Sequence, residues 1–386
     1  MIGNLYLFLR EIRPVHITKD MLGIQTRKSI LYLDQSFWSM AFRKDPPESG
    51  KAMRQIEELL ELQLLAVPYS STHEAETQLW DERRHDLLRF IQVASRGHRF
   101  EPYYGVERTQ ILKAFQAYLA NSPAAYAIDE RDALLSCVHD WDDAFSVSVH
   151  RPVSAIEVQR RRGFKQRAVD ELEKTLTDWK VSTNTFEQDM ELELRDSARI
   201  LIGNFGKKTS RLWAGDFSAL LNSPIDTEIV EDMLYILRRK GSAELATIID
   251  FFKSRYFTDV PSQQLSARLF SAFKKRVREG MYPDPRKARE RLNGFLFDVQ
   301  HAATYIPYCD AFFGDRFMAD LLNDVNVAVE QAFGCKVFSS AKWPEFFGWL
   351  DSIEAGMTPD HADGLGWAYP KYRPKATVAP KSANAP

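Results

Sequence analysis

The sequence predicts an α/β protein with a central parallel sheet that is interrupted by a large all-helical insertion. Near both ends of the 386-residue chain, short apolar runs end in a polar residue, as buried parallel strands do. Segments with helical spacing of apolar residues alternate with these runs. Between the two end regions, residues 81–286 carry helical patterns and almost no strand patterns. These three observations together define the expected fold class.

The N-terminal part predicts a strand, a helix and a second strand. Residues 30–33 are Ile-Leu-Tyr-Leu and run directly into Asp34, as expected of a strand that delivers a side chain to the carboxyl edge of a sheet. Apolar residues between 53 and 62 follow helical spacing, and residues 64–69 are strand-like again. A Ser-Ser-Thr sequence then predicts a helix N-cap, with Glu74 in the first turn.

The C-terminal part repeats this alternation. We expect residues 1–80 and 287–350 to build one core around the insertion, and residues 351–386 to form a tail that is partly disordered. Within the insertion, Pro and Gly breaks separate several helices, and the lack of a fixed period argues against a solenoid. The expected elements after the insertion are a helix at 287–305, a strand at 311–313, a helix at 316–333 and a strand at 336–339.

Composition restricts the function classes. A net charge of -2 and a pI near 6.5 give no overall attraction to nucleic acid, so a polyanion site requires a local group of Lys and Arg. The cysteines, Cys137, Cys309 and Cys335, show neither disulfide nor zinc-site spacing, which favours a cytoplasmic protein. Charged residues interrupt the apolar stretch at 5–9, so we expect no targeting segment and no membrane anchor.

Carboxylates occur at four places where an α/β sheet would present them: Asp34, Glu74, Asp298 and Asp315. Mg²⁺ and Mn²⁺ prefer oxygen ligands and can bridge a scissile phosphate, so converging carboxylates indicate metal-dependent phosphodiester chemistry. Each residue taken singly is more often structural. An Asp after a strand is commonly a helix cap, and an acid in a first helical turn commonly complements the helix dipole.

The order of these acids resembles that of PIN-like domains. Residues 298–315, Asp-Val-Gln-His-Ala-Ala-Thr-Tyr-Ile-Pro-Tyr-Cys-Asp-Ala-Phe-Phe-Gly-Asp, are similar to the late motif of that family, in which an acid opens a helix and a further Asp precedes a short strand that ends in the last acid. Residues 336–346 are similar to the ending that follows. Tyr-Leu-Asp34 resembles the first-strand acid of the family, and Ser-Ser-Thr-His-Glu74 its helix-borne second acid.

The resemblance covers residues 28–80 and 287–350, and it departs from the family in two ways. A very long insertion separates the second acid from the third, and Gly314 stands where the family often has Ser or Thr. The resemblance implies a three-layer α/β core with a central parallel sheet. It also implies an endoribonuclease in which water activated by Mg²⁺ or Mn²⁺ attacks the phosphate in line, without a protein nucleophile.

The resemblance also implies roles for individual residues. Asp34, Glu74, Asp298 and Asp315 would be the catalytic carboxylates. Asp34, Asp298 and Asp315 would bind metal, and Asp310 is either a further ligand or a structural acid. Glu76 is the less favoured alternative to Glu74.

Nucleic-acid contacts are expected from other side chains. His301, one helical turn after Asp298, either contacts a carboxylate or phosphate or packs as a hydrogen-bonded histidine. Phe37 and Trp38 either stack a base or pack in the core. The densest basic group either tracks a phosphate backbone or forms a solvated helix face. That group contains Arg160, Arg161, Arg162, Lys165 and Arg167.

The expected partner is nucleic acid, with RNA favoured over DNA. A regulatory or inhibitory protein and a second copy of the chain are further candidate partners, and a role in stress response or antiviral defence follows only by analogy with the family. Two alternatives stay open: a catalytically silent PIN-like module within a larger assembly, and a flap-type nuclease that acts on DNA. Residues 203–209 depart from the phosphate-loop pattern, so a nucleotide triphosphatase is not expected.

Overall fold

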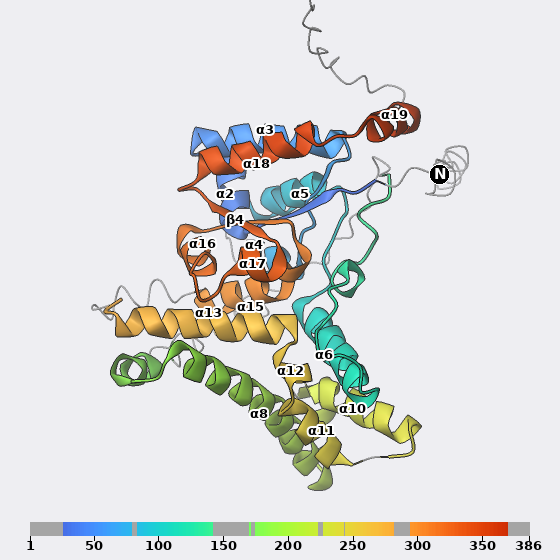
Figure 1. The fold of residues 1–386 in the computed structure, drawn as a ribbon, viewed down its shortest axis with the longest axis vertical. Helices are drawn as coiled ribbons and strands as arrows, with labels where there is room; N and C mark the ends of the chain where they lie inside the picture. The colour runs from blue at the N-terminus through green and yellow to red at the C-terminus, as the bar shows by residue number, and fades with distance from the viewer. Residues whose placement is uncertain are drawn as a thin grey trace, which may run out of the picture.

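The protein is a mainly helical α/β protein with a small four-stranded, all-parallel sheet (Figure 1). The computed structural model describes residues 26–78, 83–141, 170, 174–222, 227–242, 244–281 and 294–369. The sheet and its covering helices form one part of the molecule, and helices from the middle of the chain extend from it.

The strands come from both ends of the chain. They are β1 (Ser29–Leu33), β2 (Leu65–Ala66), β3 (Ala311–Gly314) and β4 (Lys336–Ser339). Their order is β2-β1-β3-β4, and all neighbours are parallel. In the central pair, Leu33 of β1 lies opposite Phe313 of β3. The two ends of the chain therefore build one sheet, as the sequence predicts.

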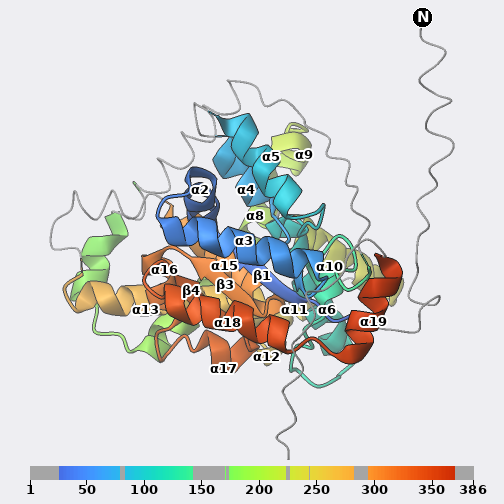
Figure 2. The ribbon, with the colours of Figure 1, turned by 90° about the horizontal axis from the view of Figure 1, so that it is seen from above.

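One face of the sheet is covered by helices that also come from both ends. They are α2 (Gln35–Arg43), α3 (Pro47–Glu61), α5 (Arg84–Ala94), α18 (Trp343–Ala355) and α19 (Pro359–Ala368). In Figures 1 and 2, α3 and α18 lie side by side over the sheet. Because strand side chains alternate between faces, Leu31, Leu33 and Phe313 all point to this side. There Phe313 packs against Phe37 of α2 and Phe346 of α18.

The other face carries Ile30, Tyr32 and Phe312. The Tyr32 ring stacks between Phe312 and Tyr305, with centroids 5.7 and 5.5 Å away. Two covering helices come from the region predicted as an insertion, so that region shares the core of the sheet. The helices on this face are α6 (Tyr103–Leu119), α13 (Pro261–Arg278), α15 (Phe295–Tyr305), α16 (Arg316–Leu322) and α17 (Val329–Phe333).

A further hydrophobic cluster joins α6 to the remaining helices of the middle region, away from the sheet (Figure 1). These helices are α8 (Phe186–Trp213), α10 (Thr227–Arg239), α11 (Leu245–Phe252) and α12 (Arg255–Thr258). Two further short α-helices are described, α4 (Ser71–Thr77) and α9 (Ala219–Asn222), together with two 3₁₀ helices, η1 (Glu130–Asp132) and η2 (Ile306–Tyr308).

Three elements differ from the sequence prediction. β2 has two residues because the chain leaves the ladder before Pro68, which has no N–H to donate. The expected helix at 316–333 is two helices, because Asp324 accepts hydrogen bonds from the backbone and side chain of Asn326 and favours a turn. The folded chain also extends beyond the expected core boundary at 350, since α19 buries Leu365 and His361 against the sheet layer.

The apolar stretch at 5–9 and the start of the helix expected at 287–305 lie outside the described residues. Within the described ranges, every helix is too short or too polar to span a membrane. The three cysteines are free thiols, and two of them, Cys309 and Cys335, are buried.

The glycine at position 314, between Phe313 and Asp315, has a steric explanation. A Cβ at this position would overlap the ring of Phe312, which is buried and stacked on Tyr32. We expect Gly314→Ser to lower the free energy of unfolding by about 1–3 kcal/mol, because the ring cannot move without disturbing its stack. Urea unfolding checks this. The matched control is Gly348→Ala in α18, where a Cβ meets nothing within 4 Å, and an equal loss in both variants would contradict the explanation.

Candidate functional site

Two carboxylates lie directly after the central strands of the sheet. Asp34 follows β1, and its backbone N–H donates to the Phe313 carbonyl of β3 at 2.9 Å. Asp315 follows β3. Because β1 and β3 are parallel neighbours, both residues lie at the same edge. The helices that follow cover opposite faces of the sheet, α2 one and α16 the other, so this edge is the topological switch point where open α/β sheets bind ligands.

Both acids also cap the helices that they precede. The Ser36 hydroxyl donates to Asp34 Oδ2 at 3.0 Å, and the Met318 N–H donates to Asp315 Oδ1 at 2.6 Å. Both residues therefore have the structural role that is common for an Asp after a strand, which is that of a helix N-cap. Capping accounts for only part of their environment, because the charge of Asp315 also acts on Asp34.

Glu76 of α4 is the third carboxylate of this edge. Gln35, next to Asp34, donates through Nε2 to Thr77 Oγ1, next to Glu76, at 3.1 Å. Burial, followed by the charges of Glu76 and Asp315, raises the pKa of Asp34 from 3.8 to about 7, although the hydrogen bond from Ser36 opposes the shift. The ionised Asp34 carboxylate is thus disfavoured, and a cation beside it would relieve the repulsion.

Glu74, which the sequence favoured over Glu76, lies elsewhere. Its carboxylate forms an ion pair with Arg99 at 3.3 Å, and the Arg99 guanidinium lies over the ring of Tyr69. Residues two apart on a helix point about 200° from each other, so only one of the two glutamates can face Asp34. The packing of α4 places Glu76 in that position.

His73 holds α4 against β1. Its Nδ1 accepts from the Ser70 N–H at 2.9 Å, so its Nε2 carries the proton and donates to the Leu33 carbonyl at 2.8 Å. The side chain is fully buried. It joins the N-cap of α4 to the last residue of β1, directly before Asp34. No role for His73 was predicted from the sequence, although a side chain at the third helical position that returns to the N-cap is a known capping arrangement.

This buried histidine predicts a pH dependence of stability. Burial lowers the pKa of His73 from 6.5 to about 4, so the unfolded chain takes up the proton first as the pH falls. The stabilisation is complete above pH 6.5 and lost as the pH approaches 4. Wild type should lose about 3 kcal/mol more than His73→Gln over this interval, because glutamine can cap the helix without titrating. Urea unfolding at each pH measures both proteins, and parallel pH profiles would contradict the assignment.

Asp298 and His301 lie on α15, which faces α4. His301 is buried, and its Nε2 lies 2.5 Å from Thr72 Oγ1 of α4. A direct contact of this side chain with nucleic acid is therefore not supported, because its accessible surface is only 5%. Asp298 is half-buried in the first turn of α15, with its carboxylate beside Gly294.

Other predicted residues lie outside the switch point. Asp310 precedes β3, at the opposite edge of the sheet, and its carboxylate accepts from the Ile30 N–H at 2.7 Å. The geometry thus supports Asp310 as a structural acid rather than as a further metal ligand. Phe37 and Trp38 are fully buried in the core and cannot stack a base in this conformation. The basic group Arg160, Arg161, Arg162, Lys165 and Arg167 lies outside the described residues.

The donor set fits a hydrated divalent cation. Among the residues that the structure describes, no three His, Cys, Asp or Glu side chains are close enough to form a ready-made metal cluster. Mg²⁺ does not require one, since it keeps several waters and commonly binds through one or two carboxylates together with substrate phosphate. Asp34 and Asp315 provide two carboxylates on adjacent strands, and the crowding at Asp34 favours a positive charge.

Part of this site could be predicted from the sequence. The positions of Asp34 and Asp315 follow from local strand patterns. Choosing Glu76 over Glu74 required knowing how α4 is rotated about its own axis. The only local signal for this is that Thr72 and Glu76, four residues apart, lie on the same face of the helix.

Comparison with known proteins does not assign this chain to a family. No protein-family model matches the chain, and no curated protein or solved structure shows significant similarity to it.

Proposed function

We propose that this protein is a divalent-metal-dependent nuclease with a PIN-like core, acting in the cytoplasm on RNA. One observation carries the proposal: Asp34 and Asp315 end the two central parallel strands at the switch point, where the charge of Glu76 also faces Asp34. Converging carboxylates at such an edge are what phosphodiester hydrolysis with Mg²⁺ or Mn²⁺ requires. The order of acids that resembles PIN-like domains supports the same assignment.

Each side chain has a defined task in this proposal. Asp34 and Asp315 would hold Mg²⁺ or Mn²⁺ directly, and Glu76 would hold it directly or through water. When bound, the ion supplies charge stabilisation for the phosphate and activation of the attacking water. Ser36 and His73 fix the position of Asp34, one by a hydrogen bond to its carboxylate and the other through the Leu33 carbonyl. Asp298, reached through α15, is a further candidate carboxylate.

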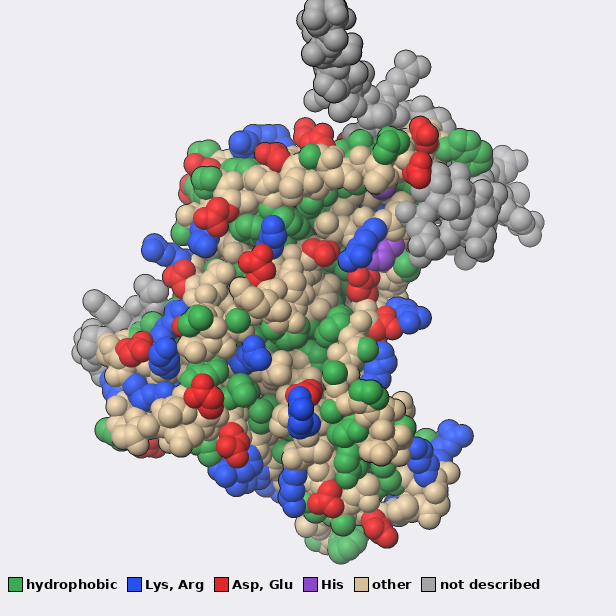
Figure 3. Space-filling view, viewed as in Figure 1, with side chains coloured by type: hydrophobic (Ala, Val, Ile, Leu, Met, Phe, Trp, Pro, Cys, Tyr) green, Lys and Arg blue, Asp and Glu red, His purple; other side chains and the backbone are tan. Residues whose placement is uncertain are grey.

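Substrate binding requires local contacts. Figure 3 shows Lys and Arg side chains interspersed with Asp and Glu over one face of the molecule, so this face presents no extended patch of one sign. With a net charge of -2, the protein also lacks a general attraction for polyanions. We therefore assign phosphate contacts to local basic groups, the sequence 160–167 first among them.

The test is cleavage of labelled RNA, single-stranded DNA and duplex DNA with Mg²⁺, with Mn²⁺ and with excess chelator. We expect metal-dependent cleavage of RNA. Glu76→Gln should lower the rate by about tenfold or more, because it removes a charge at the metal. Glu74→Gln is the matched control on the same helix and should stay close to wild type, since Glu74 pairs with Arg99. Cleavage of DNA alone would favour the flap-type alternative, and full activity in chelator would refute metal dependence.

A further inference from the structure

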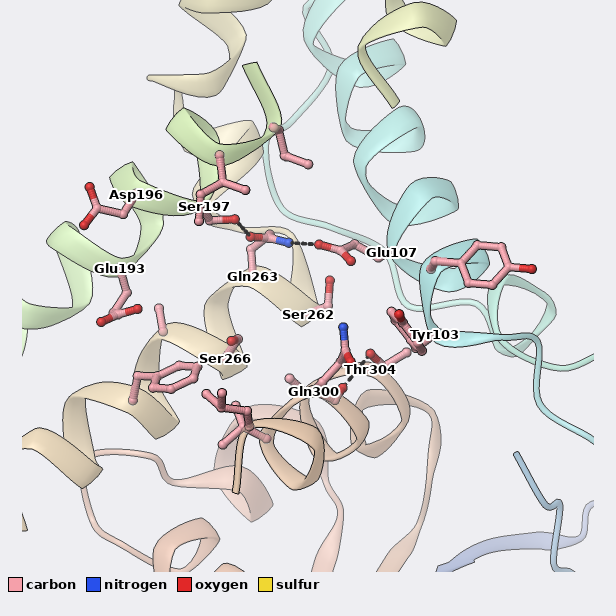
Figure 4. Close-up of a pocket in the computed structure, with 18 of the residues that line it drawn as sticks. Tyr103, Glu107, Glu193, Asp196, Ser197, Ser262, Gln263, Ser266, Gln300 and Thr304 are labelled. Atoms are coloured by element: carbon pink, nitrogen blue, oxygen red, sulfur yellow. Dashed lines mark hydrogen bonds between the residues drawn. The ribbon is translucent and has the colours of Figure 1, made fainter. Parts of the chain in front are cut away.

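A cavity lies on the other side of α15, between α6, α8 and α13 (Figure 4). Its volume is about 730 Å³, which suits a small organic molecule. Leu296, Gln300 and Ala303 of α15 line it, and by helical periodicity they face away from His301, which contacts α4. The cavity is therefore separate from the carboxylate edge of the sheet.

The acids that line the cavity already have partners among the described residues. The pairs are Glu193 with Lys274, Asp196 with Arg199, and Glu107 with Gln263. The last of them is a hydrogen bond of 2.6 Å from Gln263 Nε2 to Glu107 Oε1 (Figure 4). A ligand therefore meets these carboxylates already engaged, and it is the neutral polar side chains of the lining that offer it hydrogen bonds.

Ser262, in the first turn of α13, lines the cavity with a buried hydroxyl that lacks a partner. The residue is 5% exposed, and its Oγ forms no hydrogen bond within the part of the chain that the structure describes. Other hydroxyls of these helices are satisfied within their own helix. Ser271 donates to the Ala267 carbonyl, and Thr304 donates to the Gln300 carbonyl, both at 2.7 Å. Because buried hydroxyls in native proteins are normally satisfied, a polar atom within the cavity would complete Ser262.

Gln300 of α15 presents a side-chain amide to the same part of the cavity. Figure 4 shows this amide directed toward the Ser262 hydroxyl, with Tyr103 of α6 beside it. The side chain is half-buried, and no described residue forms a hydrogen bond with its amide. An amide carries an acceptor oxygen next to a donor nitrogen, so it can form two parallel hydrogen bonds with a flat molecule that has a donor beside an acceptor. Glutamine recognises the edge of adenine in this way.

We propose that this cavity binds a neutral nucleobase, with adenine as the best match. The Gln300 amide would pair with the amino group of adenine and the ring nitrogen next to it. The ring of Tyr103 would stack on the base, and the Ser262 hydroxyl would hydrogen-bond a further polar atom of the ligand. None of these three side chains belongs to the carboxylate edge of the sheet, so the inference does not depend on the nuclease assignment.

Two nucleosides test the hydrogen-bonding edge of the base: adenosine, and purine riboside, which has the same ring system and ribose but lacks the amino group. Isothermal titration calorimetry on the full-length protein in excess chelator should show adenosine bound about tenfold more tightly than purine riboside. Absence of adenosine binding, or equal affinity for both nucleosides, would overturn the proposal. The readout is independent of nuclease activity, so failure of either proposal leaves the other standing.

A free nucleoside and an unpaired base of RNA present the same edge, and a competition arm distinguishes these two sources. A short oligoadenylate is added to the adenosine complex, again in excess chelator so that the RNA stays intact. Displacement of adenosine by the oligoadenylate would identify the ligand as a base carried by RNA. Adenosine binding that the oligoadenylate leaves unchanged would identify it as a free nucleoside, and both results support a nucleobase site.

Two variants locate the site. Gln300→Leu removes the amide at nearly constant volume, so adenosine should bind about tenfold more weakly and no better than purine riboside, a loss of discrimination that general damage to the fold would not cause. The matched control, Gln264→Leu, makes the same change at a half-buried position of α13 that is not among the described lining residues, and it should bind as wild type does. Ser266→Leu, which adds bulk to the lining, should abolish binding and decides the question if Gln300→Leu does not fold. Unchanged affinity in Ser266→Leu would place adenosine elsewhere and refute the site.

Discussion

The Asp34→Asn variant is expected to lose metal-dependent RNA cleavage by at least about 100-fold while it remains folded. Asparagine caps a helix as well as aspartate does, so α2 should keep its N-terminus. The substitution removes the carboxylate on which the charges of both Glu76 and Asp315 act, and with it the charge that a metal ion would neutralise. Initial rates at saturating Mg²⁺ measure the effect, with thermal unfolding as the check on folding.

Asp310→Asn is the matched control for this prediction. It makes the same chemical change at the opposite edge of the sheet, before the neighbouring strand β3, where the side chain accepts from the Ile30 N–H and an amide oxygen can do so too. Its cleavage rate should stay within a few-fold of wild type. Equal losses in the two variants would indicate that the sheet, rather than the switch point, is being disturbed, and unchanged activity in Asp34→Asn would rule out the proposed mechanism.

The Phe313→Ala variant is expected to lose about 3–5 kcal/mol of unfolding free energy, the largest stability effect that we predict. Phe313 is fully buried in β3, and its ring packs against Phe37, Trp343 and Phe346 with centroids 4.9 to 5.0 Å away. This cluster joins the N-terminal and C-terminal parts of the chain directly beneath Asp34 and Asp315. The cavity left by the ring would therefore loosen both the fold and the spacing of the two carboxylates.

Urea unfolding followed by tryptophan fluorescence measures this loss. Phe217→Ala supplies the control, because it removes the same ring from a position that is 71% exposed, where the change should stay within about 0.5 kcal/mol. Similar losses in the two variants would contradict the role of Phe313. If cleavage is also measured, Phe313→Ala should lower it at temperatures where the protein is still mostly folded.

Features that depend only on residues close together in the sequence could be predicted from it. The apolar runs before Asp34 and Asp315 predicted β1 and β3, because a buried parallel strand requires such a run wherever it lies. Their position as helix caps follows from the same short stretch. The pairing of the two ends of the chain could also be anticipated, since a strand in isolation cannot satisfy its backbone hydrogen bonds.

Only the tertiary structure decided how these elements meet. The choice of Glu76 over Glu74 depends on the rotation of α4, which His73 fixes through the Leu33 carbonyl some forty residues earlier in the chain. The burial of Phe37, and the place of Asp310 at the far edge of the sheet, likewise follow from packing between distant segments. Periodicity shows which face of a helix is apolar, but long-range contacts determine which neighbour that face meets, and so which carboxylates share one site.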